Sequence, residues 1–132
     1  MQAQGVKEFT ETAEFFTEYD ALVAQADNKF IVYLTGGENA EGVNWCPDCV
    51  AAKPAITSKI LEKTSLQVLK GVVVQANTWC GVADHPYKAH KTLKAGGVPS
   101  VMLVCDGQVM MRAESGDDFA NDDLLKTIAD GE

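Results

Sequence analysis

The stretch Trp45-Cys46-Pro47-Asp48-Cys49 follows a strand-like apolar run and places two cysteines three positions apart, where a helix can begin. With Cys46 as the N-cap, Pro47 takes the first helical position, where its missing N–H costs nothing. Asp48 then lies in the first turn, where the helix dipole favours negative charge. The free backbone N–H of Cys49 points back at the Cys46 sulfur. Because the thiolate is the reactive form of cysteine, the stretch predicts a redox dithiol.

Length and composition set the broad class. The chain has 132 residues, which fits one domain over residues 1–132, and 46% of them are hydrophobic, as in ordinary globular proteins. The net charge of −8 argues against nucleic-acid and anionic-membrane partners, which need clustered Lys and Arg. Residues 1–12 are polar and contain no apolar signal core, so we expect a cytoplasmic protein. Cysteines in the cytosol stay mostly reduced, which favours a catalytic Cys-x-x-Cys over a structural disulfide.

Hydrophobic periodicity and turn signals predict the element order β-α-β-α-β-α-β-β-α. Alternation of strands and helices requires parallel strands with helices on both faces, and the final pair of strands adds an antiparallel hairpin at Asp106-Gly107. Pro54 lies inside the second helix, where we expect a kink. The expected strands cover residues 6–9, 30–34, 69–74, 100–105 and 108–113, and the expected helices cover 12–26, 86–93, 119–129 and a segment from 49 onward.

This order, with Trp-Cys-x-x-Cys opening the second helix, resembles the thioredoxin superfamily. Pro54 matches the proline of the active-site helix, Val98-Pro99 matches the cis-proline, and Asp106-Gly107 matches the hairpin turn. The Trp-Cys-Pro-Asp-Cys variant, the long preceding loop and the chain length are closer still to the family of the thioredoxin-related protein of fourteen kilodaltons. The resemblance implies an α/β, thioredoxin-like fold with a central mixed β-sheet, parallel except for the C-terminal hairpin, flanked by helices on both faces.

The resemblance also implies a mechanism. Cys46 would attack a substrate disulfide as the nucleophile, and Cys49 would resolve the mixed disulfide. Trp45 would offer an apolar ledge beside the sulfur, and Val98, before Pro99, would present backbone groups to an extended substrate. The expected activity is that of a cytosolic protein-disulfide reductase acting on disulfide-containing proteins or on small disulfides such as cystine. The protein would be a monomer with no bound cofactor or metal, recycled with NADPH by a flavoenzyme similar to thioredoxin reductase.

Three departures from thioredoxin affect this site. Tyr33 stands where thioredoxin has a buried aspartate that helps to deprotonate the second cysteine. Either the Tyr33 hydroxyl takes over that role, or the proton of Cys49 leaves through water or by way of Asp48. Between the cysteines, Pro47-Asp48 replaces the Gly-Pro of thioredoxin; Asp48 lies beside a developing thiolate, and like charges raise a pKa. The loop from Gly36 to Asn44 is longer than in thioredoxin and carries Glu38 and Glu41, so we expect it to narrow the substrate range.

The same residues allow other functions. In one alternative the dithiol only switches a binding surface, without turnover. In another it holds zinc, although no second Cys-x-x-Cys exists and the histidine spacing is not that of a zinc finger. A periplasmic-type oxidase is a further alternative, which the absence of a signal core opposes. The further candidate zinc ligands are Cys80, His85 and His90, the two histidines being expected at the surface, and Cys105 is expected to act as a small hydrophobe within a strand.

Overall fold

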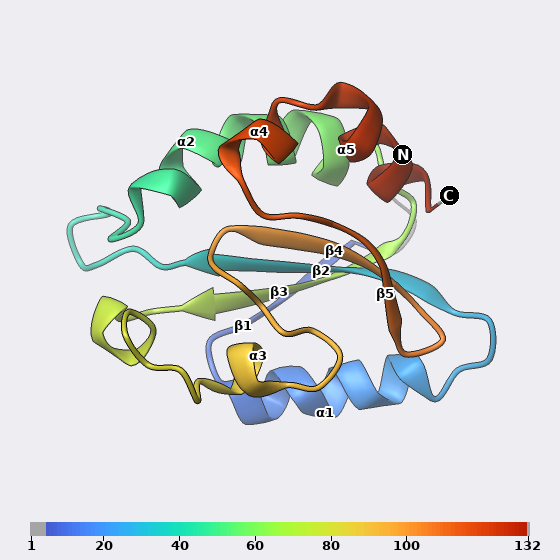
Figure 1. Ribbon diagram of the computed structural model, residues 1–132, viewed down its shortest axis with the longest axis horizontal. Helices are drawn as coiled ribbons and strands as arrows, with labels where there is room; N and C mark the ends of the chain where they lie inside the picture. Colours follow the sequence, from blue (N-terminus) through green and yellow to red (C-terminus); the bar gives the residue numbers. More distant parts are fainter. Residues whose placement is uncertain (1–4, 132) are drawn as a thin grey trace.

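The computed structural model describes residues 5–131, so the first four residues and the last residue of the predicted domain lie outside the described part. A five-stranded sheet runs through its middle in the order β1-β3-β2-β4-β5 (Figure 1). Its strands are β1 (Val6–Phe9), β2 (Lys29–Gly36), β3 (Gln67–Val73), β4 (Ser100–Cys105) and β5 (Gln108–Ala113). Strand β3 pairs in parallel with β1 and β2, whereas β4 pairs antiparallel with β2 and β5. The predicted mixed sheet is therefore confirmed.

Helices cover both faces of this sheet (Figure 1). One face carries α1 (Thr12–Val23) and the short α3 (Pro86–Ala89). The opposite face carries the remaining three α-helices and the π-helical turn η1, whereas a 3-10 turn, η2 (Ala76–Thr78), follows β3. The elements of the second face are α2 (Pro47–Ile56), η1 (Thr57–Leu61), α4 (Gly116–Phe119) and α5 (Asp122–Asp130).

The central strand β2 explains why two cores form. Its side chains alternate, so that Phe30, Val32 and Leu34 join the core beneath α1, and Ile31 and Tyr33 join the core beneath α2 and α5. All five side chains are buried, which accounts for the nearly continuous apolar run of this strand. The strand thereby fixes the point at which the chain leaves the sheet and continues toward the two cysteines.

The expected helix boundaries differ from the observed ones where local capping intervenes. The predicted C-terminal helix is split, because the Asn121 side chain accepts a hydrogen bond from the backbone N–H of Leu124 and starts α5 anew. Helix α3 ends before His90, whose backbone is extended, so it is shorter than predicted. After Pro54 the helix changes at Thr57 from α-type to π-type hydrogen bonding.

Strand and turn boundaries agree more closely with expectation. Strand β2 extends to Gly36, two residues beyond the predicted run, and β3 covers residues 67–73 instead of 69–74. The turn residues Asp106 and Gly107 both have positive φ, as a two-residue hairpin with favourable twist requires. Within residues 5–131 there is no helix of the length and apolar character needed to cross a bilayer.

The two histidines were expected at the surface, but both rings pack against aromatic side chains: His85 against Trp79, and His90 against Phe16. His85 is 8% exposed and caps α3, its Nδ1 accepting the backbone N–H of Tyr87 at 3.1 Å. His90 Nδ1 accepts the backbone N–H groups of Thr92 and Leu93, and its ring stacks on Phe16. Burial lowers the pKa of both imidazoles, so both act as neutral acceptors.

The His85 cap predicts a pH dependence of stability. Its pKa in the folded state lies below the value of 6.5 because of burial and then the Lys88 charge, with Asp84 opposing. The unfolded chain therefore binds more protons, and the free energy of unfolding falls as the pH drops through 6.5. His85→Asn keeps a capping acceptor without a titrating group, so we expect urea unfolding at pH 7.5 and 5.0 to differ less in this variant. An unchanged pH dependence would contradict this assignment.

Candidate redox site

The redox site lies where β2 ends and α2 begins. Cys46 is the N-cap of α2, with Pro47 as the first helical residue, as the sequence predicts. The backbone N–H of Cys49 donates to the Cys46 sulfur at a distance of 3.2 Å. The two sulfur-bearing residues are therefore linked through the first turn of the helix, and all four cysteines of the chain are free thiols in this structure.

Asn44 holds the start of the helix against the sheet. Its side-chain oxygen accepts the backbone N–H of Cys46 at 2.8 Å, and its side-chain nitrogen donates to the carbonyl of Gly36 at 2.9 Å. One amide thus joins the end of β2 to the N-cap of α2. Sequence reasoning did not single out Asn44; its position two residues before a cysteine N-cap is the signal that was available.

The preceding loop is closed by its own hydrogen bonds. Glu38 and Asn44 form an isolated antiparallel bridge, and the Asn39 side chain accepts the backbone N–H groups of Glu41 and Val43. Both glutamates are exposed, and Glu38 also lines a hollow that reaches Cys49. The two carboxylates of the loop therefore lie in different surroundings.

Gly36 is the second residue that sequence reasoning missed. Its backbone N–H donates to the Cys49 sulfur at 3.3 Å. A Cβ atom at this position would lie 2.8 Å from Cys46 Cβ, 2.9 Å from Asn44 Oδ1 and 3.0 Å from Trp45 Cε2. Only glycine fits, because the last residue of β2 is pressed directly against the helix start.

On its other side, Cys46 approaches the loop before β4. Its thiol donates to the carbonyl oxygen of Val98 at 3.6 Å, and the Val98–Pro99 peptide bond is cis, as the resemblance implied. The Val98 carbonyl is therefore occupied by the thiol in the reduced protein. Both cysteines are buried: Cys46 is 5% exposed and Cys49 is 2% exposed.

Burial dominates the electrostatics of Cys46. It raises the pKa of the Cys46 thiol to about 12, and the neighbouring Cys49 thiol and the Asp48 charge act in the same direction. The backbone N–H of Cys49 opposes them and lowers this pKa. The hydrogen bond to Val98 also favours the protonated form, because only a thiol can donate it. The helix start thus positions the Cys46 sulfur, while burial favours the protonated form of the Cys46 thiol.

Cys49 faces a separate hollow of about 520 Å³ on the β1 side of the motif. Tyr33 lines it, and burial raises the pKa of the Tyr33 phenol, a hydrogen bond with Thr35 lowers it, and the sulfurs of Cys49 and Cys46 raise it further. The ammonium of Lys70 lies 5.6 Å from the centre of the Tyr33 ring and 3.3 Å from the Glu8 carboxylate. Tyr33 is therefore close enough to Cys49 for a charge on that sulfur to raise the pKa of the phenol.

The remaining predicted residues have separate roles. Trp45 is half-buried, and its indole N–H donates to the Val73 carbonyl at 2.8 Å, which ties the motif to β3. Cys80 is exposed, and Cys105 is partly buried beside Asp106 at the hairpin turn. The structure does not bring the candidate zinc ligands together: residues 5–131 contain no group of three or more His, Cys, Asp or Glu side chains placed to hold a metal.

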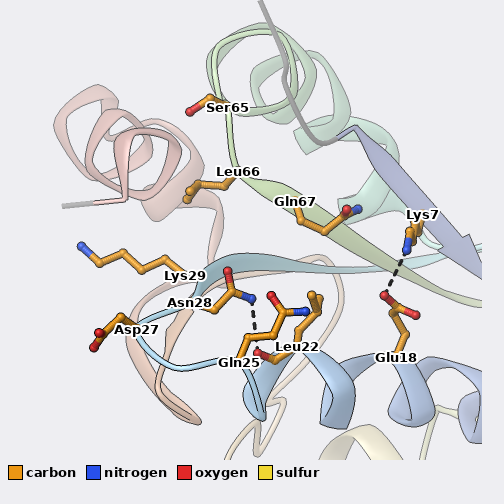
Figure 2. A pocket seen from close by; sticks show the side chains of 10 residues that line it. All are labelled: Lys7, Glu18, Leu22, Gln25, Asp27, Asn28, Lys29, Ser65, Leu66 and Gln67. Atoms are coloured by element: carbon orange, nitrogen blue, oxygen red, sulfur yellow. Dashed lines mark hydrogen bonds and ion pairs between the residues drawn. The ribbon is translucent and has the colours of Figure 1, made fainter.

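A second hollow, of about 500 Å³, lies away from the cysteines (Figure 2). It is bordered by the end of α1 and the first residues of β2 and β3, and the Lys7–Glu18 ion pair crosses one side of it. The Asn28 side chain is turned to the carbonyl of Leu22. No thiol or histidine lines this hollow.

Comparison with known proteins agrees with this geometry. The family described as "Thioredoxin domain-containing protein 17-like, thioredoxin domain" matches residues 2–130. The chain belongs to this family. Thioredoxin domain-containing protein 17 of Mus musculus is 30% identical over 106 residues, covering 75% of this chain and 80% of the relative. Thioredoxin-like protein Clot of Oryza sativa subsp. japonica is 28% identical over 119 residues, covering 83% and 84%.

Solved structures show the same fold at lower sequence identity. Thioredoxin NaTrxh from Nicotiana alata superposes with a TM-score of 0.59 at 14% identity, covering 96% of this chain and 91% of that protein. The fold is thus that of thioredoxin. Family membership and the paired thiols together support a function of the thiol–disulfide oxidoreductase type.

The close packing at Gly36 predicts a specific defect. Gly36→Ala places a methyl group closer to Cys46, Asn44 and Trp45 than van der Waals contact allows. The free energy of unfolding should therefore fall by about 1–3 kcal/mol. Urea unfolding measures the loss, and the rate of Cys46 alkylation reports whether the helix start has shifted. Gly97→Ala is the matched control, because a Cβ there meets no heavy atom within 4 Å. Equal losses in the two variants would show that Gly36 is not under this constraint.

Proposed function

We propose that the protein is a disulfide reductase that works by thiol–disulfide exchange between Cys46 and Cys49. The observation that carries this proposal is the 3.2 Å contact from the Cys49 N–H to the Cys46 sulfur at the N-terminus of α2. That contact and the helix dipole both favour negative charge on Cys46 when it loses its proton. A second thiol one helical turn away supplies the resolving group.

The exchange proceeds in two steps. The Cys46 thiolate attacks one sulfur of a substrate disulfide, forms a mixed disulfide and expels the other sulfur as a thiolate. The Cys49 thiol then gives its proton to solvent and attacks the Cys46 sulfur, which releases the second substrate thiolate and leaves a Cys46–Cys49 disulfide. The two substrate thiolates take up their protons from solvent. The substrate gains two electrons, and the dithiol loses two.

The hollow beside Cys49 supports the second step. Cys49 must lose its proton to attack, and the hollow offers a polar path to solvent past the Tyr33 hydroxyl and the Lys70 ammonium. A positive charge and a hydroxyl donor both stabilise a nearby thiolate. In this proposal Tyr33 and Lys70 are positioning residues that stabilise the Cys49 thiolate, and solvent in the hollow takes the proton that the carboxylate of thioredoxin helps to remove.

Return to the dithiol needs an external reductant. We propose a cytosolic setting in which NADPH and a flavoenzyme similar to thioredoxin reductase supply two electrons, with a monomeric protein acting on protein disulfides or on cystine. These points rest on the resemblance and on the name of the relatives' family. The chain itself needs no bound cofactor for exchange, since both electrons are held by its own sulfurs.

A second candidate function follows from the high pKa of Cys46. A thiol that burial holds protonated, with a pKa of about 12, reacts slowly with disulfides at neutral pH. Such a dithiol suits a redox switch, which is oxidised once and alters a binding surface. Reduction of cystine or insulin with NADPH and the reductase separates the two: repeated turnover supports the reductase, and stoichiometric oxidation supports the switch.

Substitution of each thiol tests the proposed roles. Cys49→Ser should accumulate a mixed disulfide through Cys46 and lose turnover, because the resolving thiol is missing. Cys46→Ser should form no mixed disulfide and show only background turnover. Mass spectrometry of the trapped adduct identifies the attacking sulfur. The assignment would be wrong if Cys49 of the Cys46→Ser variant formed an adduct as fast as Cys46 of the Cys49→Ser variant does.

Tyr33→Phe extends the same experiment to the second step. It retains both thiols and the ring beneath Lys70 but loses the hydroxyl. The first step should keep its rate, whereas decay of the mixed disulfide should slow and its pH profile should move to higher pH. Slowing of the first step alone would place Tyr33 on the Cys46 side of the site.

A further inference from the structure

We infer that a groove between α2 and α4 binds a lysine or arginine side chain of the substrate, close to the disulfide being reduced. This inference rests on the proposed function and names the substrate class that the site favours. The α2–α4 groove encloses about 550 Å³. Its lining residues are Asp48, Ala51, Ala52, Ala55, Pro99, Glu114, Ser115, Gly116, Phe119 and Ala120.

The α2–α4 groove begins beside the attacking sulfur. Asp48 lies two residues after Cys46 on the same helical turn, and Pro99 follows Val98, whose carbonyl accepts the Cys46 thiol at 3.6 Å. From this end the groove follows α2 through Ala51 and Ala55. A substrate chain whose sulfur meets Cys46 therefore brings its neighbouring residues to the mouth of the groove.

Every charge on the lining of the α2–α4 groove is negative. Asp48 and Glu114 are the charged members of the lining, and no lysine, arginine or histidine is among them. The Asp48 side chain is exposed and has no ion pair within the described chain. The Glu114 carboxylate accepts hydrogen bonds from the backbone N–H of Gly96 and the Ser100 hydroxyl and forms an ion pair with Arg112 at 3.3 Å, so Asp48 carries the unpaired charge of the described lining.

The rest of the α2–α4 groove suits the stem of a long cationic side chain. Three alanines of α2 and Phe119 supply the apolar part of the lining. Lysine and arginine bury their methylene stems on such surfaces while the charged head stays at a polar rim. An acidic or short polar side chain gains neither the apolar contact nor the ionic one.

The loop from Gly36 to Asn44, which we expected to narrow the substrate range, does not reach the α2–α4 groove. Glu38 of that loop lines the hollow of Cys49 instead. Glu41 is exposed on the loop and does not line the α2–α4 groove. Selection for cationic substrates is therefore assigned to Asp48.

The test compares three peptide disulfides with lysine, glutamine or glutamate two residues from the cysteine. Single-turnover reduction by the full chain gives a rate for each peptide. The lysine peptide should react about fivefold faster than the glutamate peptide at low salt, since each exposed ion pair changes a rate by roughly 1.4- to 5-fold. The ratio should decrease as the salt concentration rises.

Matched variants locate the effect in the α2–α4 groove. Ala51→Lys introduces a cation on an exposed lining position and should remove or reverse the preference, whereas Ala51→Gln adds similar bulk and should keep it. Asp48→Asn should reduce the lysine-to-glutamate ratio. Glu62→Gln, at the far end of the same helical segment, changes the net charge by the same amount and should leave the ratio unchanged. The ratio is the decisive readout, because a change in Cys46 reactivity affects all peptides equally.

Failure of this inference is distinguishable from failure of the proposed function. Equal rates for the three peptides, or an equal response to Asp48→Asn and Glu62→Gln, would overturn the groove assignment and leave disulfide reduction intact. Absence of reduction of any peptide would overturn the reductase. In that case the reduced lysine peptide is titrated against labelled protein, and amide shifts at Ala51, Ala52 and Phe119 support the groove, whereas their absence overturns it.

Discussion

The contact between the backbone N–H of Cys49 and the sulfur of Cys46 is the constraint on which the rest of the site depends. It exists because a cysteine occupies the N-cap of α2, where serine, threonine or aspartate would normally supply an oxygen. The cap is seated on the end of β2 through Asn44 and Gly36, so the helix start cannot shift without disturbing the central strand. A cap that stabilises a helix thereby also fixes the position of the reactive atom.

The two sulfurs of the motif face different surroundings. Cys46 is held against the Val98 carbonyl beside the α2–α4 groove, whereas Cys49 lines the polar hollow that Tyr33 and Lys70 share. Substrate and proton can therefore use opposite sides of the same helical turn. Burial opposes this arrangement, because it raises the pKa of the Cys46 thiol and so favours its protonated form. In the proposed exchange, a bound substrate changes the surroundings of Cys46, which is why we assign selectivity to the groove beside it.

Much of the fold could be predicted because its signals are local. The apolar run of β2, the Asp106-Gly107 turn and the cysteine-proline helix start each specify their own geometry, and the structure contains all three. The helix boundaries were less predictable, because Asn121 starts a new helix inside an apolar pattern that continues across the break. The roles of Asn44 and Gly36 could not be read from the sequence, since they depend on how closely β2 approaches α2 in space. The balance between burial and the helix start at Cys46 likewise requires the packed structure.

Exchange through this site requires that Cys46 and Cys49 form one reversible two-electron couple in which the other thiols take no part. A redox titration in glutathione buffers, followed by rapid alkylation and mass spectrometry, tests this requirement. We expect a single transition with a potential of about −200 to −270 mV, a disulfide that joins Cys46 to Cys49, and free thiols at Cys80 and Cys105 throughout. A disulfide from Cys46 to Cys80, or a dithiol that cannot be oxidised reversibly in this range, would contradict it.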